Sequence, residues 1–246
     1  MPESETSYRQ SHQGRGLDYH HRFIRNPRRR MMWQIEQRIL DRVLDQIHDE
    51  ETDEIEYLDF ACGTGRVLAF VSARTDTATG VDISESMLEV AATSAPQAEL
   101  ISADITLDSS PLTGRTFDLV TAFRFFPNAE ESLRTEAIAA LAACLKPGGR
   151  LVLNNHRCRS SLRQRLVRLL TLGRRGRSGM SHREVTRLVT AAGLEIERVA
   201  HAGVVPEHEW VLLWPRFAVE WFERLATRLP LARIAENLVY TCRRST

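Results

Sequence analysis

Apolar residues along this chain fall into two kinds of stretch. Short runs rich in β-branched and aromatic residues, bounded by glycine, proline or acidic residues, predict strands. They occupy residues 55–60, 78–82, 100–105, 117–123, 151–155, 194–200 and 237–242. Stretches with helical spacing or helix-forming composition lie between them, at 32–47, 67–71, 85–92, 132–145 and 185–192. Strands that alternate with helices predict an α/β fold with a largely parallel sheet.

Two of the predicted helices begin with an N-cap pattern. Ser84 precedes the helix at 85–92, and Ser181 with Glu184 has the spacing of a capping box ahead of 185–192. Both serines are therefore expected to accept a hydrogen bond from the first turn of their helix.

The sharpest change of pattern follows the first strand. The apolar run that ends at Phe60 gives way to the small residues of 61–65, and an apolar segment resumes at Val67. This order predicts a strand, a tight turn and the start of a helix. Glycine lets the backbone approach a ligand closely, and a helix N-terminus favours an anionic group. The segment indicates a nucleotide-like cofactor site, with a purely structural turn as the alternative.

The spacing of the glycines separates two kinds of cofactor. A dinucleotide-binding turn has a small residue at its third glycine position, where this chain has Leu68. Counted from Asp59, the sequence Asp59-Phe60-Ala61-Cys62-Gly63-Thr64-Gly65 instead resembles the first motif of class I S-adenosylmethionine (AdoMet) methyltransferases.

Three further stretches follow in the order found in that family. Asp82 ends the second strand at about the 20-residue distance where such sheets place a ribose-binding acid. Asp104 ends the third strand, and Lys146-Pro147-Gly148-Gly149 resembles the turn into the fifth. The resemblance covers residues 55–156. It implies a Rossmann-like, seven-stranded, mostly parallel sheet with an antiparallel last strand, flanked by helices.

The resemblance also implies how AdoMet would be bound. The glycine turn would approach the methionine end, Asp82 the ribose, and Asp104 with Ile105 the adenine. Phe123 is expected near the methionine portion, and Tyr19 and Arg22 would reach the methionine end or the acceptor. The alternative is that the stretch around Tyr19 and Arg22 is a solvated basic segment ahead of a packing helix. The predicted cofactor residues are Tyr19, Asp59, Ala61, Gly63, Gly65, Asp82, Ile83, Met87, Asp104, Ile105 and Phe123.

The loop after the fourth strand is where this superfamily differs between acceptors. Residues 122–125 lack the Asn/Asp-Pro-Pro-aromatic motif of base and glutamine N-methyltransferases, and no Pro-Cys nucleophile is present. Arg124 stands where metal-dependent catechol-type enzymes hold an acid. These differences favour metal-free transfer to oxygen, nitrogen or carbon, and we predict no metal site.

His156 and Arg124 are the candidate catalytic residues. His156 follows the fifth strand, and the carboxyl ends of parallel strands line the ligand crevice. Histidine is the usual base near neutral pH for an acceptor that must lose a proton. We therefore hypothesise that His156 is that base or orients the acceptor, and that Arg124 binds an anionic substrate group. The alternative is that His156 only forms hydrogen bonds within a polar loop.

The remaining segments suggest an order of parts along the chain. Residues 1–17 predict a disordered tail, 18–54 an N-terminal helical lid, and 55–246 the AdoMet-binding domain. Residues 157–182 contain many arginines and no acid, which indicates either a basic flap for a phosphate- or carboxylate-bearing acceptor or a solvated helix face and loop. The tryptophan-containing stretch 205–229 predicts a helical insertion.

Composition limits the location and the partners. The formal net charge of +1 argues against a global field of the nucleic-acid-binding kind. The four cysteines lack C-x-x-C spacing, which favours structural thiols over a zinc site or disulfides. No apolar run approaches the ~18 residues that span a bilayer, and the N-terminus lacks a signal-peptide pattern. We therefore predict a cytoplasmic protein with no membrane partner.

Residues 123–130 and 154–156 look similar to bacterial methyltransferases of glycan or other small-molecule biosynthesis. This favours a small-molecule or glycan acceptor, methylated on oxygen or nitrogen. Two alternatives stay open: an RNA methyltransferase that uses the Arg-rich segment, and a non-catalytic AdoMet-binding protein. The sequence indicates neither the acceptor nor the oligomeric state.

Overall fold

The computed structural model describes residues 27–50, 54–156, 158–161, 164–165, 169–171, 179–201, 221, 225, 235 and 237–245. The predicted tail at 1–17, the first part of the predicted lid at 18–26, half of 157–182 and most of 205–229 lie outside these residues. Within the described part, no helix is both long enough and apolar enough to traverse a lipid bilayer.

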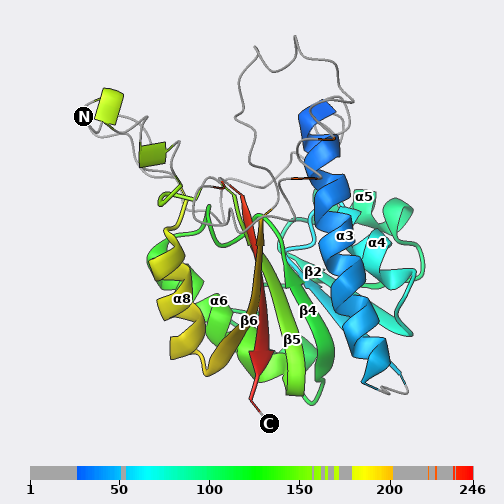
Figure 1. The fold of residues 1–246 in the computed structure, drawn as a ribbon. Coiled ribbons are helices and arrows are strands. Elements are labelled where there is room, and N and C mark those ends of the chain that lie inside the picture. The colour runs from blue at the N-terminus through cyan, green and yellow to red at the C-terminus, as the bar shows by residue number, and fades with distance from the viewer. Residues whose placement is uncertain are drawn as a thin grey trace, which may run out of the picture.

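Seven strands form one sheet in the order β3-β2-β1-β4-β5-β7-β6 (Figure 1). Their bounds are β1 Glu56–Phe60, β2 Thr77–Asp82, β3 Glu99–Ser102, β4 Phe117–Ala122, β5 Leu145–Asn155, β6 Leu194–His201 and β7 Leu238–Arg244. Strand β7 is antiparallel to both of its neighbours, and β1 to β5 pair in parallel. The predicted Rossmann-like sheet with its antiparallel last strand is confirmed.

Helices cover both faces of this sheet. Their bounds are α3 Pro27–Asp49, α4 Arg66–Ser72, α5 Glu85–Ser94, α6 Glu131–Cys144 and α8 His182–Ala191, with a short 3-10 helix at Ser110–Leu112. In Figure 1 helices α3, α4 and α5 lie on one side of the strands and α6 and α8 on the other. Successive strand residues alternate between two buried clusters, with Leu119 and Val152 facing α3 and Val120 and Leu153 facing α6.

The order of the strands fixes where a ligand can enter. After β1 the chain winds outward through β2 and β3, and it then returns to place β4 on the other side of β1. In open α/β sheets the crevice lies beyond the carboxyl ends of the strands at such a reversal. The carboxyl ends of β1 and β4 therefore mark the expected site.

Of three local expectations, one is confirmed and two differ from the structure. Ser181 and Glu184 form the predicted capping box, but Ser84 makes no side-chain cap bond, because its hydroxyl lies 3.1 Å from that of Ser86. The segment Lys146–Gly149 is not a separate turn before the fifth strand. It lies within β5, where the register with β4 shifts between Phe117 and Leu119.

Helix α3 is part of the core. Leu40 and Leu44 are fully buried in a cluster with residues of β1, β4 and β5. Arg74 binds the helix from outside through Asp41 and Asp45, at 3.0 and 2.7 Å. The part of the predicted lid that the structure describes is thus a packed element of the sheet's covering layer.

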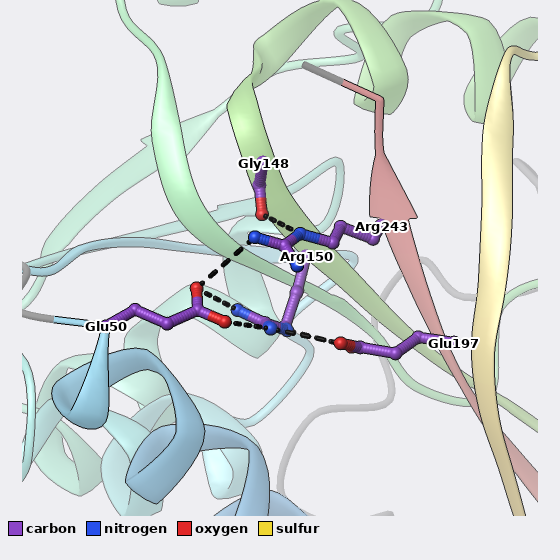
Figure 2. A network of polar contacts seen from close by, with 5 residues as sticks. All are labelled: Glu50, Gly148, Arg150, Glu197 and Arg243. Atoms are coloured by element: carbon purple, nitrogen blue, oxygen red, sulfur yellow. Dashed lines mark hydrogen bonds and ion pairs between the residues drawn. The ribbon is translucent and has the colours of Figure 1, made fainter.

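A buried arginine fastens the end of α3 to the far strands (Figure 2). The Arg150 guanidinium, on β5, donates to both carboxylate oxygens of Glu50 at 2.9 and 2.6 Å and to Glu197 of β6 at 2.9 Å. Arg243 of β7 lies 3.5 Å from Glu50 and donates to the Gly148 carbonyl at 3.2 Å. Because a buried guanidinium is costly without such partners, this network holds four elements in one arrangement.

We expect Glu50→Gln to lower the free energy of unfolding by about 1–2 kcal/mol at pH 7, since it weakens charged hydrogen bonds of a partly exposed carboxylate. Bonding to Arg150 holds the pKa of Glu50 below its ordinary value of 4.5. That stabilisation is therefore complete above pH 4.5 and disappears as the pH falls through the lower folded value. Urea unfolding at several pH values measures it.

The control is Glu99→Gln, which removes the more exposed ion pair with Arg115 and should cost less than about 0.5 kcal/mol. Equal losses from the two substitutions would contradict the assignment of a stabilising role to the Arg150 network.

Candidate functional site

A cavity of about 320 Å³ lies beyond the carboxyl ends of the strands, at the reversal between β1 and β4. This volume falls in the range of small-molecule sites, about 300–1,000 Å³. The loops after β1, β2, β3 and β4, together with α3, form most of its wall. The lining residues are Arg29, Met32, Asp59, Phe60, Ala61, Cys62, Gly63, Thr64, Arg66, Val67, Val81, Asp82, Ile83, Met87, Ala103, Asp104, Thr106, Phe123, Arg124, Phe125, Asn128, Leu133, His156 and Asn237.

The turn after β1 has three residues with positive φ. They are Ala61 at 52°, Gly63 at 55° and Gly65 at 75°. A Cβ on Gly63 would meet nothing within 4 Å, so the main chain is bare on this side. A Cβ on Gly65 would lie 2.9 Å from Ala91 Cα, so this glycine is needed where α4 meets α5. Gly65 does not line the cavity, in contrast to Gly63.

Asp82 connects the turn to the end of β2. Its Oδ2 accepts a hydrogen bond from the Gly63 backbone N–H at 2.8 Å, and its Oδ1 accepts from the Ser84 N–H at 2.9 Å. The Cys62 N–H also donates to the Val81 carbonyl at 3.0 Å. A carboxylate has about four acceptor positions, so Asp82 can still accept bonds from a ligand on its cavity side.

Asp59 is a buried acid in the same wall. Only 2% of it is exposed, and its Oδ1 accepts the Thr121 hydroxyl at 2.6 Å. Its Oδ2 accepts no hydrogen bond of normal geometry from any described residue. Burial raises the pKa of Asp59 to about 7, although Thr121 and the charge of Arg66 favour the ionised form. A buried acceptor with spare capacity at a cavity wall fits a cationic or hydrogen-bond-donating ligand group.

The third acid, Asp104, follows β3. Its Oδ1 accepts from the backbone N–H and the hydroxyl of Thr106, at 3.1 and 2.5 Å. Ile83 and Met87 line the cavity as predicted. Ile105 does not: it is buried in the core cluster under α6, because the loop turns its side chain to the opposite side from Asp104 and Thr106.

Several wall residues carried no functional prediction. Arg29 and Met32 come from α3, and Asn237, just before β7, donates to the Met32 sulfur at 3.7 Å. Arg66 stacks on the Trp33 ring, 4.0 Å from its centroid. The basic and aromatic residues at the start of the amphipathic helix were the only sequence feature that pointed to these wall residues. Their contact with the strand ends could not be predicted, because it depends on how α3 packs on the sheet.

Both candidate catalytic residues lie in the wall. Arg124 follows β4 with a φ of 63°, and His156 follows β5. The structure thus brings together every predicted site residue except three. Gly65 and Ile105 lie behind the wall, and Tyr19 is outside the described residues. No group of three or more His, Cys, Asp or Glu side chains suited to a metal occurs in the described part of the chain.

Comparison with known proteins agrees with this geometry. Residues 58–149 match the family model described as a methyltransferase domain. No curated protein matches the chain by sequence.

Solved structures show the same fold at low sequence identity. Magnesium protoporphyrin IX methyltransferase (ChlM) from Synechocystis PCC 6803, with bound S-adenosylhomocysteine (SAH), is 16% identical over 94% of this chain and 96% of its own, with a TM-score of 0.62. N-methyltransferase NodS from Bradyrhizobium japonicum WM9, in complex with SAH, is 15% identical over 92% and 91%, with a TM-score of 0.59. The [4+2]-cyclase SpnF is 19% identical over 84% and 82%, with a TM-score of 0.54.

Residues 58–149 thus match a methyltransferase domain, and solved structures of the same fold include ones with bound AdoMet and SAH, in agreement with the predicted class and cofactor. The sequence-based identification of the class, its cofactor and its fold is confirmed.

Proposed function

We propose that this chain transfers the methyl group of AdoMet to an oxygen or nitrogen atom of a small-molecule or glycan acceptor that carries an anionic group. The observation that carries the proposal is the cavity itself, where three carboxylates and a bare main-chain turn share one wall. Carboxylates suit the cationic ammonium and sulfonium groups of AdoMet and its hydroxyl and amino donors.

Each part of the wall has a role in this proposal. The main chain at Ala61 and Gly63 approaches the methionine end, where Asp59 accepts from the ammonium group. Asp82 accepts from the ribose hydroxyls and Asp104 from the adenine amino group. Ile83 and Met87 supply apolar contact for the adenine, and Phe123 packs near the methionine portion. Ile105, which is in the core, supports this region from behind.

The acceptor would enter from the side of Arg124 and His156. AdoMet supplies an electrophilic methyl group on a sulfonium, and its transfer depends above all on alignment. His156 takes up the proton that a hydroxyl or amine acceptor loses, and Arg124 binds an anionic group. Arg29 and Arg66 add further positive charge to the same cavity. We propose that no metal takes part, since Arg124 occupies the position of the metal-binding acid in catechol-type enzymes.

The structural neighbours support a small-molecule acceptor. Two of them are a magnesium protoporphyrin IX methyltransferase and the N-methyltransferase NodS. The RNA alternative depends on the arginines of 157–182, most of which lie outside the described residues. A role without methyl transfer has one observation in its favour, the likeness to the cyclase SpnF.

The raised pKa of Asp59 predicts that the affinity for SAH depends on pH. Because Asp59 must be ionised to pair with an ammonium group, SAH should bind the wild type about tenfold more tightly at pH 8 than at pH 6, given a pKa of about 7. Asp59→Asn should bind more weakly, with only the pH dependence of the SAH amine itself. Titration calorimetry across this range measures both. Parallel pH profiles for the two proteins would remove Asp59 from the ammonium site.

Isotope-labelled AdoMet tests the reaction itself. Purified protein incubated with cell extract and the labelled cofactor should produce a small molecule or glycan that gains the label, detected by mass spectrometry. In His156→Gln the rate of labelling should fall about 10²- to 10⁴-fold, the usual contribution of a positioned base, with SAH affinity unchanged. An unchanged rate would remove the catalytic role of His156. Label in RNA would favour the RNA alternative, and no label in any fraction would favour the non-catalytic one.

A further inference from the structure

Arg124 has a backbone conformation that is unusual for its residue type. Its φ of 63° lies in the left-handed region, which is unfavourable for a residue with a side chain. The consequence is visible in its neighbours. Phe123 is buried in the cluster that faces α3, and Phe125 in the cluster on the other side of the sheet. In a regular strand these two side chains would share a face. The kink at Arg124 therefore shapes the cavity wall after β4.

Two asparagines hold this kink in place. The Arg124 N–H donates to Asn154 Oδ1 at 2.6 Å, and the Arg124 carbonyl accepts from Asn128 Nδ2 at 2.5 Å. Asn128 is exposed, whereas only 3% of Asn154, on β5, is exposed. Asn154 does not line the cavity, so its contact with Arg124 is made from behind the wall.

Asn154 is anchored in turn by a buried acid. Its Nδ2 donates to Oε1 of Glu36, on α3, at 3.1 Å. Glu36 is 2% exposed, and its Oε2 lies 3.6 Å from Nη1 of Arg66. An apolar residue of similar volume would fill this position in α3 without the cost of burying a carboxylate. Core packing alone does not account for Glu36, but fixing the orientation of the Asn154 amide does.

We propose that Glu36 and Asn154 are positioning residues that set the acceptor wall of the methyl-transfer site by holding Arg124 in its left-handed conformation. This inference rests on the proposed function for its consequence in catalysis, whereas the contacts themselves do not depend on it. We call the hydrogen-bonded series Glu36–Asn154–Arg124 the relay. Through this relay, the placement of α3 determines the direction in which Arg124 faces an acceptor. Neither residue needs to touch the cofactor or the acceptor.

The test exchanges the polarity of the relay. Asn154→Asp replaces the amide donor by a carboxylate oxygen that faces Glu36 Oε1. Repulsion between the two acids should turn the new side chain away and so release the Arg124 N–H. Adding Glu36→Gln to that variant supplies an amide donor to the new acid and should restore the relay. Glu36→Gln alone keeps an acceptor for Asn154, so exchange at 123–128 should match the wild type, while the charge that faces Arg66 at 3.6 Å is removed. If Asn154→Asp does not fold, Glu36→Met breaks the same contact and replaces the buried charge by a side chain of similar size.

Three measurements separate positioning from stability. Hydrogen exchange of the peptide 123–128 reports the Arg124 amide, labelled-methyl transfer to the reactive extract fraction reports catalysis, and calorimetry with SAH reports the cofactor side. We expect Asn154→Asp to increase exchange and lower transfer at least about tenfold, since small misplacements of binding groups cost this much, with SAH affinity retained. The double variant should recover both readouts.

Glu50→Gln is the matched control, because it loosens the other end of α3 without touching the relay. It should lower the melting temperature and leave exchange at 123–128 as in the wild type. The proposal is overturned if exchange there is unchanged in Asn154→Asp, or if the double variant recovers nothing. A wild type that transfers no methyl group would overturn the proposed function instead, while the exchange results would still decide whether the relay holds Arg124.

Discussion

The close approach of one bare turn to the neighbouring strand end is the constraint on which the site depends. Gly63 donates its N–H to Asp82, and Gly65 lies against Ala91 with no room for a side chain. The first contact fixes a carboxylate beside exposed main chain, and the second fixes the angle between α4 and α5. Both contacts lie beyond the carboxyl ends of the strands near the reversal between β1 and β4. The cavity forms there because the loops that leave these two strands run to opposite faces of the sheet.

Buried charge serves two different purposes in this molecule. Around Arg150 it is fully paired among residues that do not line the cavity, and its effect is to hold α3, β5, β6 and β7 together. In the cavity wall the carboxylate of Asp59 is buried without a full set of partners, and burial raises its pKa to about 7. A carboxylate whose burial raises its pKa destabilises the folded protein as the pH rises between about 4 and 7. Ionisable groups that lower the stability of the folded protein in this way are common in the walls of ligand-binding sites.

The sequence predicted what depends on local spacing. The turn after β1, the acids Asp82 and Asp104 at the strand ends, and His156 after β5 all follow from motif and strand order, and the structure places them in one wall. Ile105 was assigned to the wall by its place beside Asp104, but adjacent residues after a strand face opposite sides. Glu36 carried no prediction, because it lies between the apolar positions of the helix expected at 32–47. Its burial depends on how α3 lies across β5, which no local pattern records.

The most direct test of the account is titration calorimetry of AdoMet with the wild type and Asp82→Ala. The matched control is Asp108→Ala, which removes an exposed aspartate that, like Asp82, accepts a bond from the backbone N–H of the serine two residues further on. The account predicts binding to the wild type and to the control with equal affinity, and at least about tenfold weaker binding to Asp82→Ala, because charge-assisted hydrogen bonds of about 1.5–3 kcal/mol are lost. No heat with the wild type, or equal affinity in all three proteins, would contradict it.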